Sequence, residues 1–244
     1  MTSDATSGAT SDANETEKLQ ELITRAQVVL WDFDGPICRL FAGHKAERVA
    51  AELVEWLELQ GMRELLTETE RGALDPQVVL RAVDRRHPGS DLVAELEERL
   101  TQQELRAAAS ALPTAFADPL IRTWTAVGSR LAVTADNSPR VIRAYLDGRG
   151  LTSCFAPHVY GRTADLHRLK PDPHCLDRAL NATGTAPSAA LMIGDAPSDL
   201  AAARRAGVPF LGYARDEQKR KRLGEAGAGC VVGSLEPLLA LLRA

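Results

Sequence analysis

Short apolar segments that alternate with helical segments are the feature of this sequence that most restricts its fold. The apolar segments end mostly in glycine or acidic residues and lie at 27–35, 131–134, 190–195, 209–213 and 229–233. Between them, Ser138-Pro139 and Asp172-Pro173 are typical helix starts, while Gly184 and Gly207 occupy positions typical of helix ends. Strands separated by helices form parallel sheets. We therefore predict an α/β fold whose parallel sheet carries helices on both faces.

Residues 36–118 interrupt this alternation with a stretch that shows helical periodicity only. Helical segments are predicted at 44–60, 77–86 and 90–111. Thr101 and Glu104 match a capping box, which predicts that the last segment forms two helices. The simplest interpretation is an all-helical insert at 36–118 within an α/β core made of residues 18–35 and 119–244.

The N-terminal segment, residues 1–17, carries four acidic residues, no Lys or Arg, and no apolar side chain larger than alanine after Met1. It buries too little apolar surface to offset the entropy of ordering, so we predict that it is disordered. Without it, the net charge changes from −4 to about 0. A nearly neutral folded part gives no electrostatic basis for binding nucleic acid.

Composition also excludes membrane and secreted classes of protein. No segment approaches the roughly 20 apolar residues of a membrane span, and the N-terminus lacks the features of a secretion signal. The four cysteines are scattered without a CxxC pair, which argues against a disulfide framework or a structural zinc site. The sequence predicts a reduced cytoplasmic protein with no membrane partner.

Polar residues with the chemistry of phosphoryl transfer follow the predicted strands. They are Asp32, Asp34, Thr134, Lys170, Asp195 and Asp199. The carboxyl ends of parallel strands share one edge of a sheet, where ligands bind, so these side chains are expected to converge. Clustered carboxylates stay ionised beside a cation, and hard oxygen ligands suit Mg²⁺ together with a substrate phosphate. The sequence therefore predicts a phosphate site that contains Mg²⁺.

Four short motifs carry a resemblance to a known family. The segments WDFDGPI, LAVTADNS, KPDP and GDAPSD resemble, in order, the four motifs of the haloacid dehalogenase (HAD) superfamily. The resemblance covers the chain from about Gln27 to the C-terminus. It implies a Rossmann-like core, and the helical insert resembles the C1 cap of phosphoglycolate phosphatase-like and β-phosphoglucomutase-like members.

The resemblance implies roles for the acidic residues. Asp32 is expected to be the nucleophile that forms an aspartyl-phosphate, and Asp34 the general acid and base. The metal ligands would be the Asp32 carboxylate, the Asp34 backbone carbonyl and Asp195. Asp199 would reach the metal through water or would orient Lys170. An acid at position 34 is typical of phosphatases and phosphomutases and disfavours dehalogenase chemistry.

The resemblance also implies a phosphate-binding set. Thr134, Lys170 and backbone N–H groups near Phe33 and Ala135 would hold the phosphoryl oxygens. We include Arg39 among the candidate substrate-binding residues because it follows the first motif, where a cap linker enters the site.

Some assignments keep two interpretations. Arg39, His44 and Lys45 are interpreted either as contacts to the leaving group or as solvated residues at the start of a helix. Asn137 either joins the phosphate site or caps the next helix with Ser138. The basic cluster at residues 215–222 is predicted to be the exposed face of a helix, because acidic residues are interleaved with it.

Taken together, the sequence predicts a cytoplasmic, Mg²⁺-dependent phosphatase that acts on a small phosphorylated metabolite. One alternative is a phosphomutase that uses the same two acids but protects the aspartyl-phosphate from water. The other is a non-catalytic member that binds a phosphorylated ligand or a protein. Retention of acids in every motif favours an enzyme.

Overall fold

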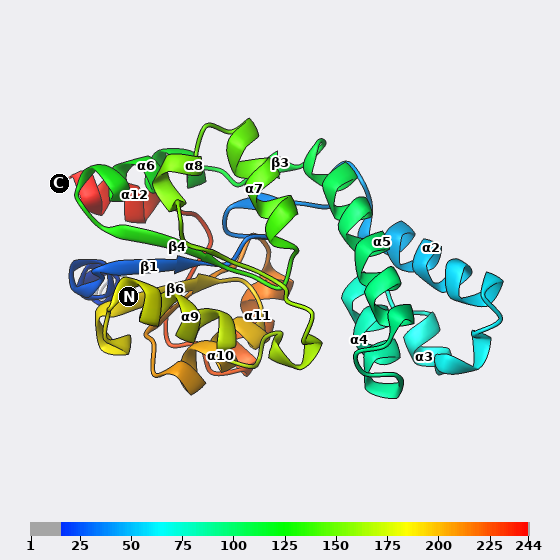
Figure 1. Ribbon diagram of the computed structural model, residues 1–244. Helices are drawn as coiled ribbons and strands as arrows, with labels where there is room; N and C mark the ends of the chain where they lie inside the picture. Colours follow the sequence, from blue (N-terminus) through cyan, green and yellow to red (C-terminus); the bar gives the residue numbers. More distant parts are fainter. Residues whose placement is uncertain (1–15, 244) are drawn as a thin grey trace, which may run out of the picture.

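The computed structural model describes residues 16–243 and is centred on a parallel sheet of six strands (Figure 1). Across the sheet the strands are β5 (Val159–Tyr160), β4 (Arg130–Thr134), β1 (Val28–Trp31), β6 (Ala190–Gly194), β7 (Phe210–Tyr213) and β8 (Val231–Val232). Every pairing in it is parallel, which confirms the predicted fold class. Of these six strands, only the edge strand β5 was not predicted.

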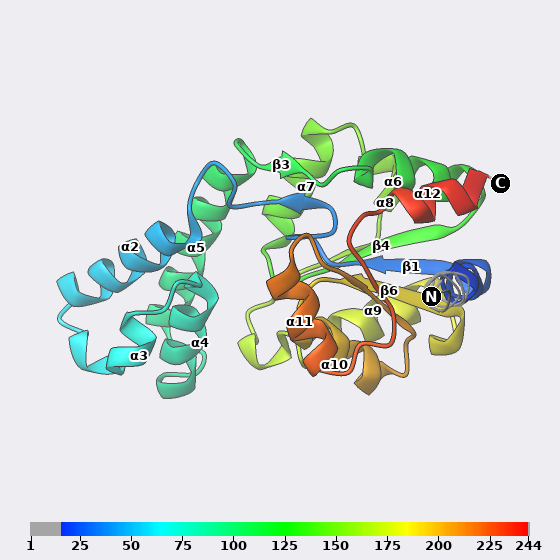
Figure 2. The ribbon, with the colours of Figure 1, turned by 180° about the vertical axis from the view of Figure 1, so that it is seen from behind.

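Helices cover both faces of the sheet, and alternate strand residues pack against each layer. Val29 and Trp31 of β1 belong to a core shared with one layer, and Trp31 meets Trp124 edge to face at 5.7 Å. Val28 and Leu30 point to the opposite layer. The first layer contains α6 (Ala117–Ala126), α7 (Pro139–Gly148), α8 (Thr152–Phe155) and α12 (Glu236–Arg243); the second contains α9 (His174–Thr183), α10 (Pro197–Ala206) and α11 (Glu217–Glu225) (Figures 1 and 2). Burial on both sides explains the apolar character of the strands.

The predicted helix ends agree closely with the structure. Gly184 and Gly207 end α9 and α10 in the left-handed conformation, with φ of 62° and 70°. Ser138 precedes α7, but its side chain makes no capping hydrogen bond. Asn137 does not cap this helix either, because its amide donates to Glu104 at 2.9 Å. Asp172 accepts from the N–H of His174, but α9 begins one residue later than predicted, with Pro173 as its N-cap and His174 as its first residue.

The helices of residues 46–108 form a separate lobe with its own apolar core (Figures 1 and 2). They are α2 (Ala46–Leu59), α3 (Glu68–Arg71), α4 (Pro76–Arg86) and α5 (Asp91–Ala108). Single-turn 3₁₀ helices occur at Arg63–Leu65 in this lobe and at Leu166–Arg168 and Pro187–Ala189 in the core. The lobe lies beyond the carboxyl ends of the central strands, on the opposite side of the molecule from the N and C labels.

Two features of this region differ from the sequence prediction. The chain passes between core and lobe through β2 (Cys38–Arg39) and β3 (Leu112–Pro113), which pair antiparallel, so the region is not wholly helical. Residues 91–108 form one helix, not two. Thr101 and Glu104 are 1% exposed and bind Arg162 of the core, so their side chains make a tertiary contact instead of a cap.

The N-terminal end of the described chain is a helix at residues 16–25. Its Leu19 and Ile23 pack into the core of the sheet domain, so Thr16 and Glu17 are helical where disorder was predicted. The rest of the predicted disordered segment, residues 1–15, lies outside the described residues. No helix among residues 16–243 is both long and apolar enough to cross a bilayer.

Candidate active site

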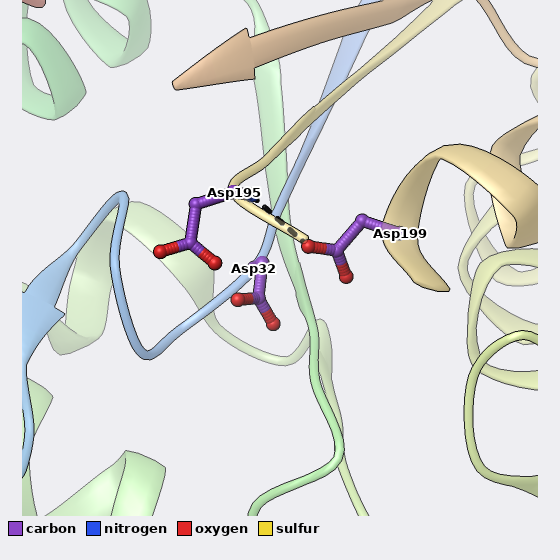
Figure 3. A group of neighbouring side chains, drawn as sticks. All are labelled: Asp32, Asp195 and Asp199. Atoms are coloured by element: carbon purple, nitrogen blue, oxygen red, sulfur yellow. Dashed lines mark hydrogen bonds between the residues drawn. The ribbon is translucent and has the colours of Figure 1, made fainter. Parts of the chain in front are cut away.

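Three acidic side chains meet at the carboxyl edge of the central strands. Asp32 follows β1, Asp195 follows β6, and Asp199 lies in the first turn of α10. All three are buried, and ligand oxygens of the three lie within 4.8 Å of one another. Asp195 and Asp199 lie on either side of Asp32 (Figure 3). Acids separated by 163 residues, from Asp32 to Asp195, are thus brought together because their strands are adjacent.

Lys170 is the cation at the centre of this cluster. Its ammonium donates to Asp32 Oδ1 at 2.7 Å, to the Thr134 carbonyl at 3.2 Å and to Asp199 Oδ1. Burial alone lowers the pKa of an ammonium, but Asp199 and Asp32 outweigh it and raise the pKa of Lys170 well above its usual value. Lys170 is therefore a fixed positive charge beside one oxygen of Asp32.

Asp199 orients its neighbours with both of its oxygens. Oδ2 accepts the N–H group of Asp195 (Figure 3) and that of Ala196 at 3.0 Å each, and Oδ1 accepts from Lys170. Gly194 makes this possible, since a Cβ there would overlap the Asp199 side chain. Of the two roles predicted for Asp199, this geometry favours the orientation of Lys170.

Asp34 lies two residues after Asp32, in the loop that leaves β1. Its Oδ1 accepts the Leu40 N–H at 2.8 Å, which holds the carboxyl toward the linker to the helical lobe. Burial raises the pKa of Asp34 to about 6, against the lowering effect of that hydrogen bond. A carboxyl with such a pKa can both donate and accept a proton near neutral pH.

Gly35 is the residue that lets the loop and Asp195 approach each other. Its φ is +131°, a conformation that residues with a Cβ rarely adopt, and a Cβ there would overlap the Asp195 carboxylate.

We expect Gly35→Ala to lower the free energy of unfolding by about 2–3 kcal/mol, from backbone strain plus overlap. Gly61→Ala is the matched control, because Gly61 has a φ of +73° but nothing within 4 Å of the added Cβ. It carries strain alone, about 1–2 kcal/mol. Urea denaturation of both variants tests this; an equal loss in the two would contradict the packing argument.

Thr134 and Ala135 were predicted to contact phosphate, but their donors are engaged elsewhere in this structure. The Thr134 hydroxyl donates to Met192 Sδ at 3.4 Å and the side chain is fully buried. The Ala135 N–H donates to the Tyr160 carbonyl at 3.0 Å. Phosphate binding by either group stays a prediction that requires a local rearrangement.

Two residues that the sequence interpretation missed support the site. Asp136 accepts the backbone N–H of Lys170 at 2.9 Å and the Arg81 guanidinium at 2.8 Å. Arg81, from α4 of the helical lobe, also donates to the Lys170 carbonyl at 2.9 Å. Asp136 is the acid within the second motif, to which the sequence interpretation gave no role, but no local signal marks Arg81, whose contacts are 55 and 89 residues away.

The basic cluster at residues 215–222 is not wholly an exposed helix face. Lys219 of α11 points inward, and its ammonium contacts Asp195 Oδ2. Arg215 and Lys219 line a cavity of about 260 Å³ with Arg39 and Lys45, whereas the His44 ring pairs with Gln103 at 2.9 Å. Arg39 and Lys45 thus lie beside the site.

A larger cavity of about 760 Å³ lies between the acids and the helical lobe. Its lining includes Asp32, Asp34 and Lys170 from the core and Arg81 and Val78 from α4. The site is therefore enclosed by both parts of the chain, as a small-molecule site requires.

The donor set fits a divalent cation. Four carboxylates, Asp32, Asp34, Asp195 and Asp199, outnumber the two ammonium groups, Lys170 and Lys219, by two charges. Burial, reinforced by Asp199, raises the pKa of Asp32 well above its usual value, as expected where like charges lack a sufficient cation. Lys219 occupies one Asp195 oxygen, but Asp195 Oδ1 accepts no hydrogen bond from residues 16–243.

Comparison with known proteins identifies the family of this chain. A sequence model of the haloacid dehalogenase-like hydrolases matches residues 26–207. The chain belongs to this family. It is similar to CbbY from Rhodobacter sphaeroides, solved in complex with phosphate, at 22% identity and a TM-score of 0.62, over 90% of this chain and all of that one. At this identity the likeness shows that the two share the HAD fold.

Two curated HAD relatives are phosphoglycolate phosphatases. The protein of Rhodospirillum rubrum is 40% identical over 114 residues, 45% of this chain and 46% of its own length. The protein of Thiobacillus denitrificans is 31% identical over 115 residues, 47% of this chain and 50% of its own. The chain thus matches about half the length of each curated relative.

Proposed function

We propose that this protein is a Mg²⁺-dependent phosphatase that hydrolyses a small phosphorylated metabolite through an aspartyl-phosphate. The observation that carries the proposal is Asp32, buried at the strand edge with one oxygen on Lys170 and the other open beside Asp195. Since the curated relatives are named phosphoglycolate phosphatases, phosphoglycolate is the first substrate to test.

Asp32 supplies the nucleophilic oxygen. Lys170 holds Oδ1 at 2.7 Å, so Oδ2 is the oxygen placed to attack phosphorus, and the leaving-group oxygen departs on the opposite side. The bond from phosphorus to the leaving oxygen breaks as the bond to Asp32 forms. Water then cleaves the acyl phosphate, which regenerates Asp32 and releases inorganic phosphate.

Asp34 moves the protons of both steps. As the acid it protonates the departing alkoxide, and as the carboxylate it takes a proton from the attacking water. Its pKa of about 6 suits both roles, and the Leu40 N–H orients the carboxyl by one oxygen. The other oxygen remains for the substrate.

The cation would be held by Asp32, the Asp34 carbonyl and Asp195. Asp199 and Lys170 would keep these acids in position around it. When bound, Mg²⁺ supplies positive charge that neutralises the clustered carboxylates and the phosphoryl oxygens. Lys219 has to release Asp195 Oδ2 if both oxygens of that acid are to reach the cation.

We also propose that residues 36–118 act as a cap on the core formed by residues 18–35 and 119–244. The cavity between α4 and the acids is the space that the cap encloses. Its closure would exclude bulk water and select the leaving group.

A screen for phosphate release over phosphorylated metabolites, with Mg²⁺ or with EDTA, tests the proposal. Release that requires the cation is expected from at least one small phosphomonoester. Conversion of a sugar phosphate to its isomer without release of phosphate would show that the protein is a phosphomutase and not a phosphatase. Binding without either reaction would favour the non-catalytic alternative.

Asp34→Asn is expected to lower the turnover number by about 10²–10⁴-fold, because the amide can neither donate the proton nor accept it. The loss should be smaller for an aryl phosphate, since a phenolate leaves without full protonation. Comparison of an alkyl and an aryl substrate measures this. Equal losses of turnover number for the two substrates would show that Asp34 is not the general acid.

A further inference from the structure

Lys219 is a cation of the site that no step of the proposed mechanism uses. It lies in the first turn of α11, and Asp216 fixes that turn by accepting the Lys219 N–H at 2.8 Å. Strands β6 and β7 are neighbours, so the segment that follows β7 lies beside the one that follows β6 and carries Asp195. The fold thus brings the Lys219 ammonium to the Asp195 carboxylate, 24 residues earlier in the chain.

The two lysines of the site are held to different degrees. The Lys170 side chain is 3% exposed, and its ammonium donates to three acceptors. The Lys219 side chain is 25% exposed, and among residues 16–243 its ammonium hydrogen-bonds to Asp195 Oδ2 alone. An ammonium with one acceptor and access to water loses less free energy when it moves aside. Lys170 is therefore a fixed charge, whereas Lys219 can exchange with another cation.

Lys219 contacts the Asp195 oxygen that faces the loop after β1. An added Cβ at Gly35 would lie closer to Asp195 Oδ2 than to Oδ1, so Oδ2 is the oxygen on the side of this loop. The carbonyl of Asp34, a proposed cation ligand, belongs to the same loop. Lys219 thus occupies the side of Asp195 from which these two residues would share a cation.

Lys219 and a divalent cation compete electrostatically for Asp195. Both are attracted by the carboxylate, and positive charges a few ångströms apart repel each other where water is largely excluded. If Lys219 withdraws, the site loses its ion pair with Asp195. If Lys219 stays, its charge weakens the attraction of the clustered acids for the cation. In both cases the ammonium makes the free energy of cation binding less favourable.

We propose that Lys219 sets the affinity of the site for its divalent cation by competing with that cation for Asp195. The proposal rests on the proposed Mg²⁺ site and extends it. Lys219 is a positioning residue that acts through Asp195, and it raises the cation concentration at which the site fills. At low cation concentration the ammonium neutralises Asp195, which would otherwise repel the acids around it.

Cation binding by Lys219→Met tests the proposal, because methionine keeps most of the length of the side chain and removes its charge. Protein treated with EDTA and desalted is titrated with MgCl₂ in a calorimeter, without substrate. The dissociation constant of the variant is expected to be at least about tenfold below that of the wild type. Lys219→Arg keeps the charge and should stay within about threefold of the wild type. Binding by Lys219→Met that is no tighter than that of the wild type would overturn the proposal.

Lys221→Met is the matched control on the same helix. The Lys221 side chain is 73% exposed, and its ammonium lies 3.9 Å from Glu225. The substitution removes the same charge from α11 but leaves the contact with Asp195 in place, so the affinity for Mg²⁺ should change by less than about threefold. A gain in affinity equal to that of Lys219→Met would show that the charge of the helix is responsible, and would overturn the assignment to Lys219.

Thermal denaturation distinguishes competition from a merely structural role of Lys219. In EDTA, Lys219→Met leaves the buried Asp195 carboxylate without its ammonium partner, so the melting temperature should fall. The same concentration of Mg²⁺ should then raise the melting temperature of the variant by more than that of the wild type, because tighter binding stabilises the folded state more. Equal increases for the two proteins would overturn the competition.

The same titrations separate the failure of this proposal from the failure of the proposed function. If the wild type binds Mg²⁺ and releases phosphate with it, but Lys219→Met binds no more tightly, Lys219 has no such role and the phosphatase stands. If Lys219→Met binds Mg²⁺ more tightly but the wild type hydrolyses no phosphomonoester, the competition stands and the phosphatase does not. Absence of Mg²⁺ binding in both proteins would overturn both proposals.

Discussion

The Asp32→Asn variant is expected to lose at least about 10³-fold of the rate of phosphate release, with its fold intact. An amide oxygen is a poor nucleophile, and no described side chain can replace it at that position, because Asp195 and Asp199 are oriented by Lys219 and Lys170. Phosphate release under saturating substrate and Mg²⁺ measures the rate, and circular dichroism checks the fold.

Stability should be unchanged or higher in this variant. The pKa of Asp32 is raised in the folded protein by burial and by Asp199, so the folded state disfavours the ionised form. Ionised Asp32 therefore opposes folding at pH values above its unfolded pKa, and asparagine removes that cost. Lys170 keeps Asp199 and the Thr134 carbonyl as partners.

Asp147→Asn is the matched control, since Asp147 is exposed in α7 and belongs to none of the four motifs. It should leave the rate within about twofold of wild type. A rate for Asp32→Asn that stays within tenfold of wild type would refute the nucleophile assignment, because removal of a true nucleophile lowers the rate by much more than tenfold.

Prediction from the sequence succeeded where the local pattern and the tertiary structure favour the same backbone conformation. Asp75 caps α4 by accepting the Gln77 N–H at 2.9 Å, with Pro76 in the first turn. Gly184 and Gly207 end their helices because the left-handed conformation there requires no long-range contact. The acids of the site were predictable for a related reason, since each follows a strand and the strand ends share one edge.

The same local pattern gave a wrong prediction where a buried tertiary contact determined the role of the side chains. Thr67 and Glu70 form a true capping box at α3, with both reciprocal hydrogen bonds present. Thr101 and Glu104 have the same spacing but lie in the middle of α5. Their partner is Arg162, 61 and 58 residues away, and no window of local sequence contains that contact.

The missed site residues have the same origin. Arg81 and Lys219 reach the acids from the helical lobe and from α11, and each looks in sequence like an ordinary charged residue of an amphipathic helix. Thr134 shows the reverse: its motif predicts a phosphate contact, whereas the structure places its hydroxyl on Met192 Sδ. Sequence motifs locate the strand ends, but side-chain direction depends on packing.

Arg162 supports the largest stability effect that we expect. Its guanidinium donates to Glu104 at 3.0 Å, to Glu97 at 2.8 Å and to Thr101 at 3.0 Å, and both the Arg162 and Glu104 side chains are almost fully buried. Burial lowers the pKa of an arginine, yet the charges and hydrogen bonds of Glu104 and Glu97 together outweigh it and raise the pKa of Arg162. The pair joins the core to α5 of the lobe.

We expect Arg162→Met to lower the free energy of unfolding by about 3–5 kcal/mol, because it leaves the Glu104 carboxylate buried without its cation. Arg140→Met is the control: Arg140 also joins the core to α5, through Glu98 at 2.6 Å, but the two side chains are 54% and 49% exposed. That surface pair should contribute no more than about 1 kcal/mol. Urea denaturation monitored by fluorescence measures both.

A second substitution separates the loss of charge balance from the loss of packing. Glu104→Gln in the Arg162→Met background removes the unpaired charge, so the double variant should recover part of the lost stability. If the double variant is as unstable as the sum of the two single variants, the buried charge is not the cause.

Since Asn137 donates to the same Glu104 carboxylate at 2.9 Å, beside Asp136 and Lys170, the Arg162–Glu104 pair also fixes the position of the lobe over the site. The variant that unfolds most easily should therefore also bind phosphate monoesters most weakly.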